Sequence, residues 1–346
     1  MKKQNLKGLS RDELLAFVDS IGEKSFRASQ LWAWIYQKGS THFDQMSNLS
    51  KALRTKLDEV ALISSLKLVK KEVSSISGTR KYLWKLEDGL TIESVFIPDG
   101  RRRTVCISSQ IGCSLKCGFC ATGKMGFIRD LMPHEILDQV ISVQRDVEDR
   151  ITNIVVMGMG EPFLNYDNVI KALSIIRDPE GIAIGHRKMT ISTAGIVPQI
   201  ERFTRENQPF QLAISLNATT TDQRSEIMPI NKKYPMKALL TAARQHVKVT
   251  RRRITFEYVL LKGVNDKPHD AGRLLKLLRN IPCKVNLIAY NPTGRKFSRP
   301  DEKRIYAFAE AIRPLLAPVT LRLSRGDDIN GACGQLATSV KKIKKS

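Results

Sequence analysis

The sequence contains few aromatic residues, no long apolar run and little acidic charge. Aromatic side chains make up 6% of the 346 residues, and no RNA-recognition-motif signature is present, so RNA recognition by a stacking sheet is not expected. No run of about 18 apolar residues occurs, which excludes a membrane-spanning helix and predicts no membrane partner. Residues 1–6 also lack the apolar stretch of a signal peptide.

Cysteine is scarce and unevenly distributed. The chain has six cysteines, and four of them lie between Cys106 and Cys120. This distribution does not resemble a disulfide framework, and it indicates a reducing compartment. We therefore expect a cytoplasmic protein.

Basic residues outnumber acidic residues by a wide margin. There are 57 Lys and Arg against 34 Asp and Glu, which gives a formal net charge of +23. A single basic cluster is usually a solvated surface, but several clusters with this surplus favour a polyanion such as nucleic acid. The clusters are Lys70 with Lys71, residues 101–103, residues 251–253 and residues 341–345.

The most informative residues are Cys113, Cys117 and Cys120, whose spacing is C-x3-C-x2-C. Three thiolates in one short loop suit a [4Fe–4S] cluster in which one iron has no protein ligand and can bind a substrate or cofactor. A structural zinc ion prefers four ligands, so the alternative is a zinc site completed by a distant His or Cys. The spacing, with Phe119 before the last cysteine, resembles the cluster loop of radical S-adenosylmethionine (SAM) enzymes.

The apolar pattern predicts an α/β fold that follows a helical N-terminal region. Residues from about 10 to 57 are expected to be helical, and a period-two pattern from residue 66 predicts strands, among them 90–97. Glu93 shares a strand face with Val95 and Ile97, so its carboxylate is either solvated at an edge or an inward functional group. Further strands alternating with helices predict an α/β barrel or part of one. These strands are 151–157, 188–192, 211–216, 254–261, 284–289 and 319–323.

Polar residues collect where the predicted barrel strands end. The turn from Gly158 to Pro162 contains Glu161, whose carboxylate is suited to a ribose or an amino group, and its glycines allow backbone to approach a ligand. Ser192, Asn217 and Asn291 lie at the ends of three other strands. Because ligands bind at the carboxyl ends of barrel strands, these turns predict one site beside the cysteine loop.

The cysteine loop, the Gly-Met-Gly-Glu-Pro turn and three further segments closely resemble the RlmN family of radical SAM methyltransferases. These segments are 106–113, 228–231 and 325–336, and the resemblance extends from about Leu6 to Leu336. It implies a partial (β/α)6 radical SAM barrel at 99–336 that ends in a catalytic cysteine segment. It also implies an N-terminal helical accessory, RNA-binding domain at 1–60, an antiparallel strand connector at 61–98 and a basic tail at 337–346.

The family's roles carry over by position. Cys113, Cys117 and Cys120 match the ligands of one [4Fe–4S] cluster per chain. Cys333 matches the cysteine that is methylated as an intermediate, Cys106 the cysteine that resolves the protein–RNA crosslink, and Glu93 the proton acceptor. Asn217 replaces a His of many members, so its contact would come from the main chain or a shorter side chain. The positions that match SAM contacts are Gly160, Glu161, Ser192, Ser215, Leu216, Asn217 and Asn291.

The resemblance implies methylation of adenine C2 in 23S ribosomal RNA and in tRNA, with two SAM molecules. Its implied partners are these RNAs and an electron donor such as flavodoxin, and the protein is expected to be a monomer. Two alternatives remain. A sibling family methylates C8 of the same rRNA adenine, but it usually lacks a proline at the position of Pro162. A non-catalytic zinc-bearing RNA-binding protein would explain the charge and the cysteine loop, but neither the Gly-Glu turn nor Cys333.

Overall fold

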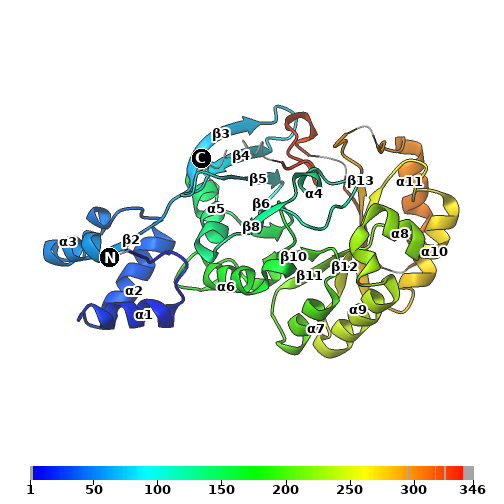
Figure 1. The fold of residues 1–346 in the computed structure, drawn as a ribbon. Coiled ribbons are helices and arrows are strands. Elements are labelled where there is room, and N and C mark those ends of the chain that lie inside the picture. The colour runs from blue at the N-terminus through cyan, green and yellow to red at the C-terminus, as the bar shows by residue number, and fades with distance from the viewer. Residues whose placement is uncertain (1–2, 148, 295, 316, 323–324, 338–346) are drawn as a thin grey trace, which may run out of the picture.

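A curved ten-stranded sheet forms the main body of the described part of the chain (Figure 1). The structure is a computed structural model that describes residues 3–147, 149–294, 296–315, 317–322 and 325–337. The strand order is β14-β13-β12-β11-β10-β9-β6-β5-β4-β3. The strands from β6 to β14 are parallel, and β5, β4 and β3 extend the sheet in antiparallel fashion. The α/β class and the partial radical SAM barrel expected from the sequence are confirmed.

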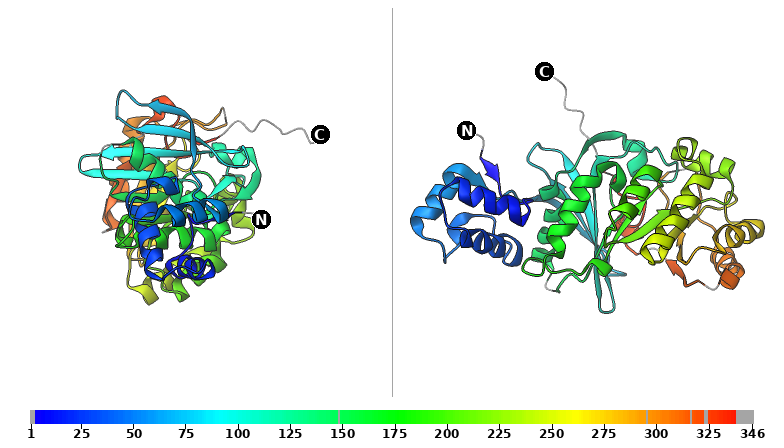
Figure 2. Two further views of the ribbon diagram at one scale, coloured as in Figure 1. Left: turned by 90° about the vertical axis from the view of Figure 1, so that its left-hand side faces the viewer. Right: turned by 90° about the horizontal axis from the view of Figure 1, so that it is seen from below.

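The barrel part of the described sheet has one parallel strand more than the expected six. Its strands are β6 (Arg102–Ile107), β9 (Asn153–Val156), β10 (Met189–Thr193), β11 (Gln211–Ser215), β12 (Ile254–Leu260), β13 (Cys283–Ala289) and β14 (Val319–Arg322). Helices follow them on the outside of the barrel (Figures 1 and 2). These helices are α5 (Pro133–Asp146), α6 (Tyr166–Arg177), α7 (Val197–Arg205), α8 (Thr221–Ile227), α9 (Met236–Thr250), α10 (Pro268–Leu278) and α11 (Glu302–Ala311).

The two faces of the barrel strands have different chemistry, which the nearly continuous apolar runs did not reveal. In β13, Cys283, Val285 and Leu287 are buried, as expected for the strand face that the outer helices cover. The alternate residues Lys284 and Asn286 line a cavity inside the barrel. The barrel therefore has an apolar core outside the sheet and a partly polar lumen inside it.

The strands before the barrel extend the same sheet. They are β3 (Lys67–Val73), β4 (Arg80–Lys85) and β5 (Thr91–Asp99). Tyr82 and Trp84 stack with ring centroids 5.1 Å apart, and the Tyr82 hydroxyl donates to Asp146 at the end of α5. A short hairpin, β7 (Gln110–Gly112) and β8 (Phe127–Asp130), flanks the cysteine loop and the short helix α4 (Ala121–Met125).

The N-terminal helices form a separate cluster at one end of the molecule (Figure 2). They are α1 (Arg11–Ser20), α2 (Phe26–Trp32) with a π-helical turn at Ala33–Gln37, and α3 (Lys51–Val60). Ser10 and Glu13 make both bonds of the expected capping box. The two-residue strands β1 (Gln4–Asn5) and β2 (Ala61–Leu62) pair in parallel, so the cluster is closed where the chain enters and leaves it. Among the described helices, none has the length and apolar character needed to cross a membrane.

A buried ion pair fastens this helical cluster to the barrel. Lys7 Nζ lies 2.6 Å from Asp138 on α5, and both side chains are almost completely buried. Burial lowers the pKa of Lys7, and the Asp138 carboxylate opposes this shift. The second oxygen of Asp138 accepts from the backbone N–H of Leu66 at 2.6 Å, so the carboxylate also holds the connection to β3.

We predict that Lys7→Met lowers the free energy of unfolding by about 3–5 kcal/mol, because it leaves the Asp138 carboxylate buried without its cation. Urea denaturation measures this loss. Lys171→Met is the matched control, since Lys171 pairs with Glu13 across the same interface but both side chains are at least one third exposed. That control should lose no more than about 1 kcal/mol. Equal losses in the two variants would contradict a special role for the buried pair.

Candidate active site

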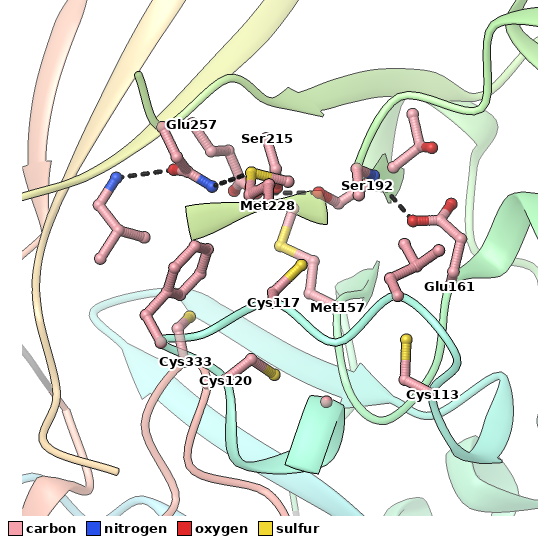
Figure 3. Close-up of a pocket in the computed structure, with 18 of the residues that line it drawn as sticks. Cys113, Cys117, Cys120, Met157, Glu161, Ser192, Ser215, Met228, Glu257 and Cys333 are labelled. Atoms are coloured by element: carbon pink, nitrogen blue, oxygen red, sulfur yellow. Dashed lines mark hydrogen bonds between the residues drawn. The ribbon is translucent and has the colours of Figure 1, made fainter. Parts of the chain in front are cut away.

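The cysteine loop and the strand-end turns border one cavity of about 150 Å³ (Figure 3). The cavity lies at the carboxyl ends of the barrel strands, where the sequence placed the site. In Figure 3 the sulfur atoms of the cysteine loop lie on one side of it, and Glu161, Ser192 and Ser215 lie across from them. The predicted residues that line it are Cys113, Cys117, Cys120, Gly160, Glu161, Ser192, Ser215, Asn217, Asn291 and Cys333.

Backbone contacts hold the cysteine loop in place. Gly112, before the first cysteine, has a φ of +73°, and a Cβ there would lie 1.8 Å from the carbonyl oxygen of Gly126. Cys113 N–H donates to that same oxygen at 2.9 Å. Gly118 N–H donates to Ile227 O at 3.0 Å, so a neighbouring helix end holds the middle of the loop. Glycine is therefore required where two backbone segments meet.

The three thiols fit an iron–sulfur cluster as a donor set. Burial raises the pKa of Cys113 to about 12 and that of Cys117 well above its ordinary value. Such thiols become thiolates only when positive charge, such as that of bound iron, compensates. Each cysteine of a [4Fe–4S] cluster binds a different iron, so the thiols need not meet at one point. Among the described residues, no three Cys, His, Asp or Glu side chains converge as ligands of a single metal ion.

The turn after β9 brings Glu161 to the cavity. Gly160 has a φ of +100°, and a Cβ there would lie 2.5 Å from the side chain of Gln110. Only glycine therefore fits at this position. The Glu161 carboxylate accepts from the backbone N–H groups of Phe163 at 3.0 Å and Ala194 at 2.7 Å. Burial raises the pKa of Glu161 to about 7, although these donors oppose the shift. A cationic group of a ligand in the cavity would stabilise its ionised form.

Glu257 on β12 connects two of the expected cofactor residues, and the sequence analysis did not identify it. Its carboxyl group accepts from the Ser192 hydroxyl at 2.8 Å and from the Ser215 hydroxyl at 3.5 Å. The Asn286 side-chain amide lies 3.5 Å from its other oxygen. Glu257 is buried in the sheet, and the sequence analysis overlooked it because its neighbours in the strand are mostly apolar. A carboxylate within a mostly apolar predicted strand was the one available signal.

Asn217 and Leu216, at the end of β11, differ in whether they border the cavity. Asn217 has a left-handed φ of +56°, and its side chain accepts from Val259 N–H at 2.8 Å and donates to the Met228 sulfur at 3.4 Å. Leu216 is fully buried and is not part of the cavity lining. Its backbone N–H donates to Glu257 O at 3.0 Å. The Asn217 side chain therefore shapes the turn while bordering the cavity.

A buried arginine fixes two of the strand-end turns. Arg224 has no exposed surface, and its guanidinium donates to Ala194 O at 2.6 Å and to Ser215 O at 3.2 Å. It also donates to the Asn231 side chain at 3.2 Å, which explains the segment 228–231 as a support of the site. Burial lowers the pKa of Arg224 to about 10, which still leaves it charged at neutral pH.

The C-terminal segment returns onto the cysteine loop and places Cys333 beside it. Ala121 N–H donates to Gly334 O at 2.8 Å, and the Thr122 hydroxyl donates to Leu336 O at 2.6 Å. The Asn291 amide donates to Cys333 O at 3.0 Å, so this expected cofactor residue also anchors the segment. Cys333 is thereby held next to Cys120, as Figure 3 shows.

A second cavity of about 660 Å³ continues from this point into the barrel lumen. Cys120, Glu257, Asn291 and Cys333 border both cavities, whereas Cys106 on β6 borders only the second. Burial raises the pKa of Cys106, and the positive charge of Arg322 on β14 opposes this shift. Cys106 and Cys333, which the resemblance assigned to one exchange reaction, therefore border the same cavity, Cys106 from β6 and Cys333 from the C-terminal segment.

Glu93 lies beside the second cavity but is not part of the lining of either. It is on the same sheet face as Cys106, because Val95 pairs directly with Cys106 and lies two residues after Glu93. Its carboxylate accepts from Ala337 N–H at 2.9 Å and lies 3.9 Å from Lys81 Nζ. Burial raises the pKa of Glu93 to about 7, and the Lys81 charge partly offsets this.

Two family models match the chain in the order of its parts. The model described as the ribosomal RNA large subunit methyltransferase N-terminal domain matches residues 4–63, and that of the radical SAM superfamily matches residues 107–275. The first covers the helical cluster, and the second covers the cysteine loop and the barrel strands β9 to β12.

Similar proteins match over nearly the whole chain. A dual-specificity RNA methyltransferase RlmN of Syntrophobacter fumaroxidans is 47% identical over 334 residues, covering 96% of this chain and 97% of its own length. One of Geobacter sulfurreducens is 48% identical over 99% of this chain and 94% of its own. A radical SAM methyltransferase from Sphaerobacter thermophilus has a crystal structure with a TM-score of 0.92 at 41% identity, over 96% of this chain and 99% of that one. The chain therefore belongs to the RlmN family of radical SAM RNA methyltransferases.

Proposed function

We propose that the protein methylates C2 of adenine in 23S rRNA and in tRNA through a methyl group carried on Cys333. The observation that supports this most is the position of Cys333, which borders both cavities. A methyl acceptor must meet the methyl donor first and the RNA base later. The junction between the first cavity and the larger lumen allows both encounters without a large movement of the segment.

The first cavity would hold the cofactors. Cys113, Cys117 and Cys120 would bind one [4Fe–4S] cluster, which supplies the electron that cleaves SAM to a 5′-deoxyadenosyl radical. The Glu161 carboxylate would pair with the amino group of SAM, because a cation compensates its burial. Ser192 and Ser215 would bind hydroxyl groups, and Asn217, Leu216 and Asn291 would contribute mostly through the backbone turns that they shape.

The need for Cys333 follows from the chemistry of the target carbon. Adenine C2 is electron-poor and reacts poorly with a methyl sulfonium, whereas a thiolate is a good methyl acceptor. Cys333 would therefore take a methyl group from one SAM molecule. The radical generated from a second SAM molecule would remove a hydrogen atom from this methyl group, and the resulting carbon radical would add to C2.

Release of the product would require Cys106. Its thiolate would attack the sulfur of Cys333, so that an S–S bond forms while the electron pair of the bond from sulfur to the transferred CH2 carbon stays with that carbon, which takes up a proton to become the methyl group. The unpaired electron left by the radical addition would return to the electron-donor system, and two electrons from the donor would reduce the Cys106–Cys333 disulfide before the next turnover. Glu93 would accept the proton that leaves C2. Its raised pKa suits a base that must be ionised near neutral pH, and Lys81 at 3.9 Å supports the ionised form.

The remaining parts complete the proposal. The helical domain at 1–60 would bind RNA outside the barrel, with the strand segment at 61–98 joining it to the barrel at 99–336. A donor such as flavodoxin would supply electrons to a monomer in the cytoplasm. The basic tail expected at 337–346 lies outside the described residues, apart from Ala337.

We predict that replacing Cys113, Cys117 or Cys120 by Ala removes the brown chromophore and all SAM cleavage, because each thiolate holds one iron. Anaerobic purification, iron analysis and measurement of 5′-deoxyadenosine test this. Cys283→Ala is the matched control, since Cys283 is buried on β13 and borders neither cavity. A colourless wild-type protein with bound zinc, or a Cys117→Ala protein with full iron and cleavage, would reject the assignment.

We predict that methylation per SAM cleaved rises with pH and is half-maximal near pH 7, where Glu93 ionises. Only the ionised carboxylate accepts a proton, so activity is lost as the pH falls below this value. Glu93→Gln should lower the ratio of methylated adenosine to 5′-deoxyadenosine by about 10²–10⁴-fold. Lys81→Met should move the midpoint to higher pH, whereas Lys85→Met, on the exposed end of the same strand, should not. A wild-type ratio that is constant from pH 6 to 8 would contradict this role.

We predict different failures for the two catalytic cysteines. Cys333→Ala should neither methylate RNA nor attach to it, because the methyl acceptor is missing. Cys106→Ala should still form the bond to adenine but not release it, so that the protein accumulates covalently bound to RNA through Cys333. Nuclease digestion followed by mass measurement of the Cys333 peptide tests this.

Two further results decide between the alternatives for the resolving thiol and for the methylated carbon. An unmodified Cys333 peptide would reject Cys106 as the resolving thiol. Mass analysis of RNA treated with the wild-type protein identifies the product, and 8-methyladenosine in place of 2-methyladenosine would replace the C2 assignment by C8.

A further inference from the structure

The lumen of the barrel has a second mouth, opposite the cofactor turns. The cavity of about 660 Å³ extends from Cys106 and Cys333 to the first residues of the barrel strands. Thr104, Asn153 and Thr190 line its walls. Its volume lies within the range of about 300–1,000 Å³ that encloses small ligands in proteins. A single nucleotide is a ligand of this size class, and the walls are polar enough to admit one.

Four cations surround this mouth, and we refer to them as the cationic rim. Arg102 is the first residue of β6, Arg187 and Lys188 immediately precede β10, and Lys284 is the second residue of β13. All four side chains line the cavity and are exposed. Because β6, β10 and β13 run parallel, their beginnings share one edge of the barrel.

No acid neutralises the rim within the described part of the chain. None of its four side chains forms an ion pair or a hydrogen bond there. Of the two acids that line the cavity, Asp99 already pairs with Arg325 at 2.8 Å, and Glu257 lies deep and accepts from Ser192 and Ser215. Unpaired cations gathered around a cavity mouth attract and bind an anionic ligand.

We propose that the cationic rim binds phosphates of the RNA strand, so that the target adenine reaches Cys106 and Cys333 through the amino-terminal mouth of the barrel. This proposal rests on the proposed function. SAM and the RNA base would then approach Cys333 from opposite ends, and neither would have to leave for the other to enter.

The depth of the lumen indicates the form of the RNA. Cys106 lies four residues beyond Arg102 on β6, which is roughly 13 Å along the strand. A base within a duplex cannot reach this depth, so the target must be unstacked from its neighbours. An acidic electron-donor protein would also be attracted by the rim. This mouth opens toward Cys106 and Cys333, however, and of the three cluster cysteines only Cys120 borders its cavity, whereas Cys113 and Cys117 border only the other.

The test compares two triple variants that remove equal charge. The rim variant is Arg187→Gln, Lys188→Gln and Lys284→Gln. The control variant is Lys237→Gln, Arg244→Gln and Lys248→Gln, whose residues are exposed on α9 outside the barrel. Binding of a tRNA anticodon stem-loop is measured from 50 to 300 mM salt, together with RNA-independent SAM cleavage and methylation of Cys333. A third variant, with Arg187→Lys and Lys188→Arg, keeps the charge of the rim and serves as a charge-preserving control.

If the wild-type protein neutralises about six phosphates, its log affinity falls with log salt at a slope of about −4 to −5. The rim variant should bind about tenfold or more weakly, with a slope less negative by about 2–3. The control variant and the charge-preserving variant should keep the wild-type values. SAM cleavage and Cys333 methylation should be unchanged in all of them, and their absence from the wild-type protein would count against the proposed function instead.

Three outcomes would overturn the proposal. The rim variant could bind RNA with the affinity and salt slope of the wild-type protein, or the control variant could lose as much affinity as the rim variant. The third is normal RNA binding by a rim variant that flavodoxin reduces more slowly, which would assign the rim to an acidic protein donor.

Discussion

The site depends on the return of the C-terminal segment onto the cysteine loop. Backbone and side-chain bonds from Ala121 and Thr122 to residues 334 and 336 join segments that are more than two hundred positions apart in the sequence. They place Cys333 at the junction of the two cavities, and Ala337 N–H continues the contact to Glu93. Without this return, the barrel would still present its strand-end turns, but Cys333, the proposed methyl acceptor, would have no fixed position between the two cavities.

Burial and charge are distributed so that each reactive group has a defined partner. Arg224 holds the carbonyl groups of the turns after β10 and β11, which bring Ser192 and Ser215 to the cavity, and Ala194 N–H in the first of these turns donates to Glu161. Carboxylates buried in this way are poor anions unless a cation is near, which is why Glu161 suits an ammonium ligand and Glu93 needs Lys81. The polar interior of the barrel therefore suits the proposed ligands, while the apolar exterior of the sheet forms the core of the fold.

The sequence allowed much of the fold and the site to be predicted because the signals were local. The spacing of Cys113, Cys117 and Cys120 and the glycines at 158 and 160 each need only a few neighbouring residues to be interpreted. The apolar runs also located six strands correctly, since a strand covered by helices is apolar along its length. Glu257 and Arg224 were not identified, because each has a role only through partners on other strands that a linear pattern does not bring together.

The sequence by itself determined the kinds of group available: three thiols in a cluster spacing, two further thiols for exchange, a carboxylate on an apolar strand and a large cationic surplus. Only the tertiary structure decided which of them meet. The charge clusters along the chain did not include the cationic rim as a unit, since Arg102, Lys188 and Lys284 lie at the beginnings of three separate strands. Parallel strands align their beginnings along one edge of the barrel and their ends along the other. The fold therefore brings distant positions together, as a group of cations at one mouth and as the predicted cofactor residues at the other.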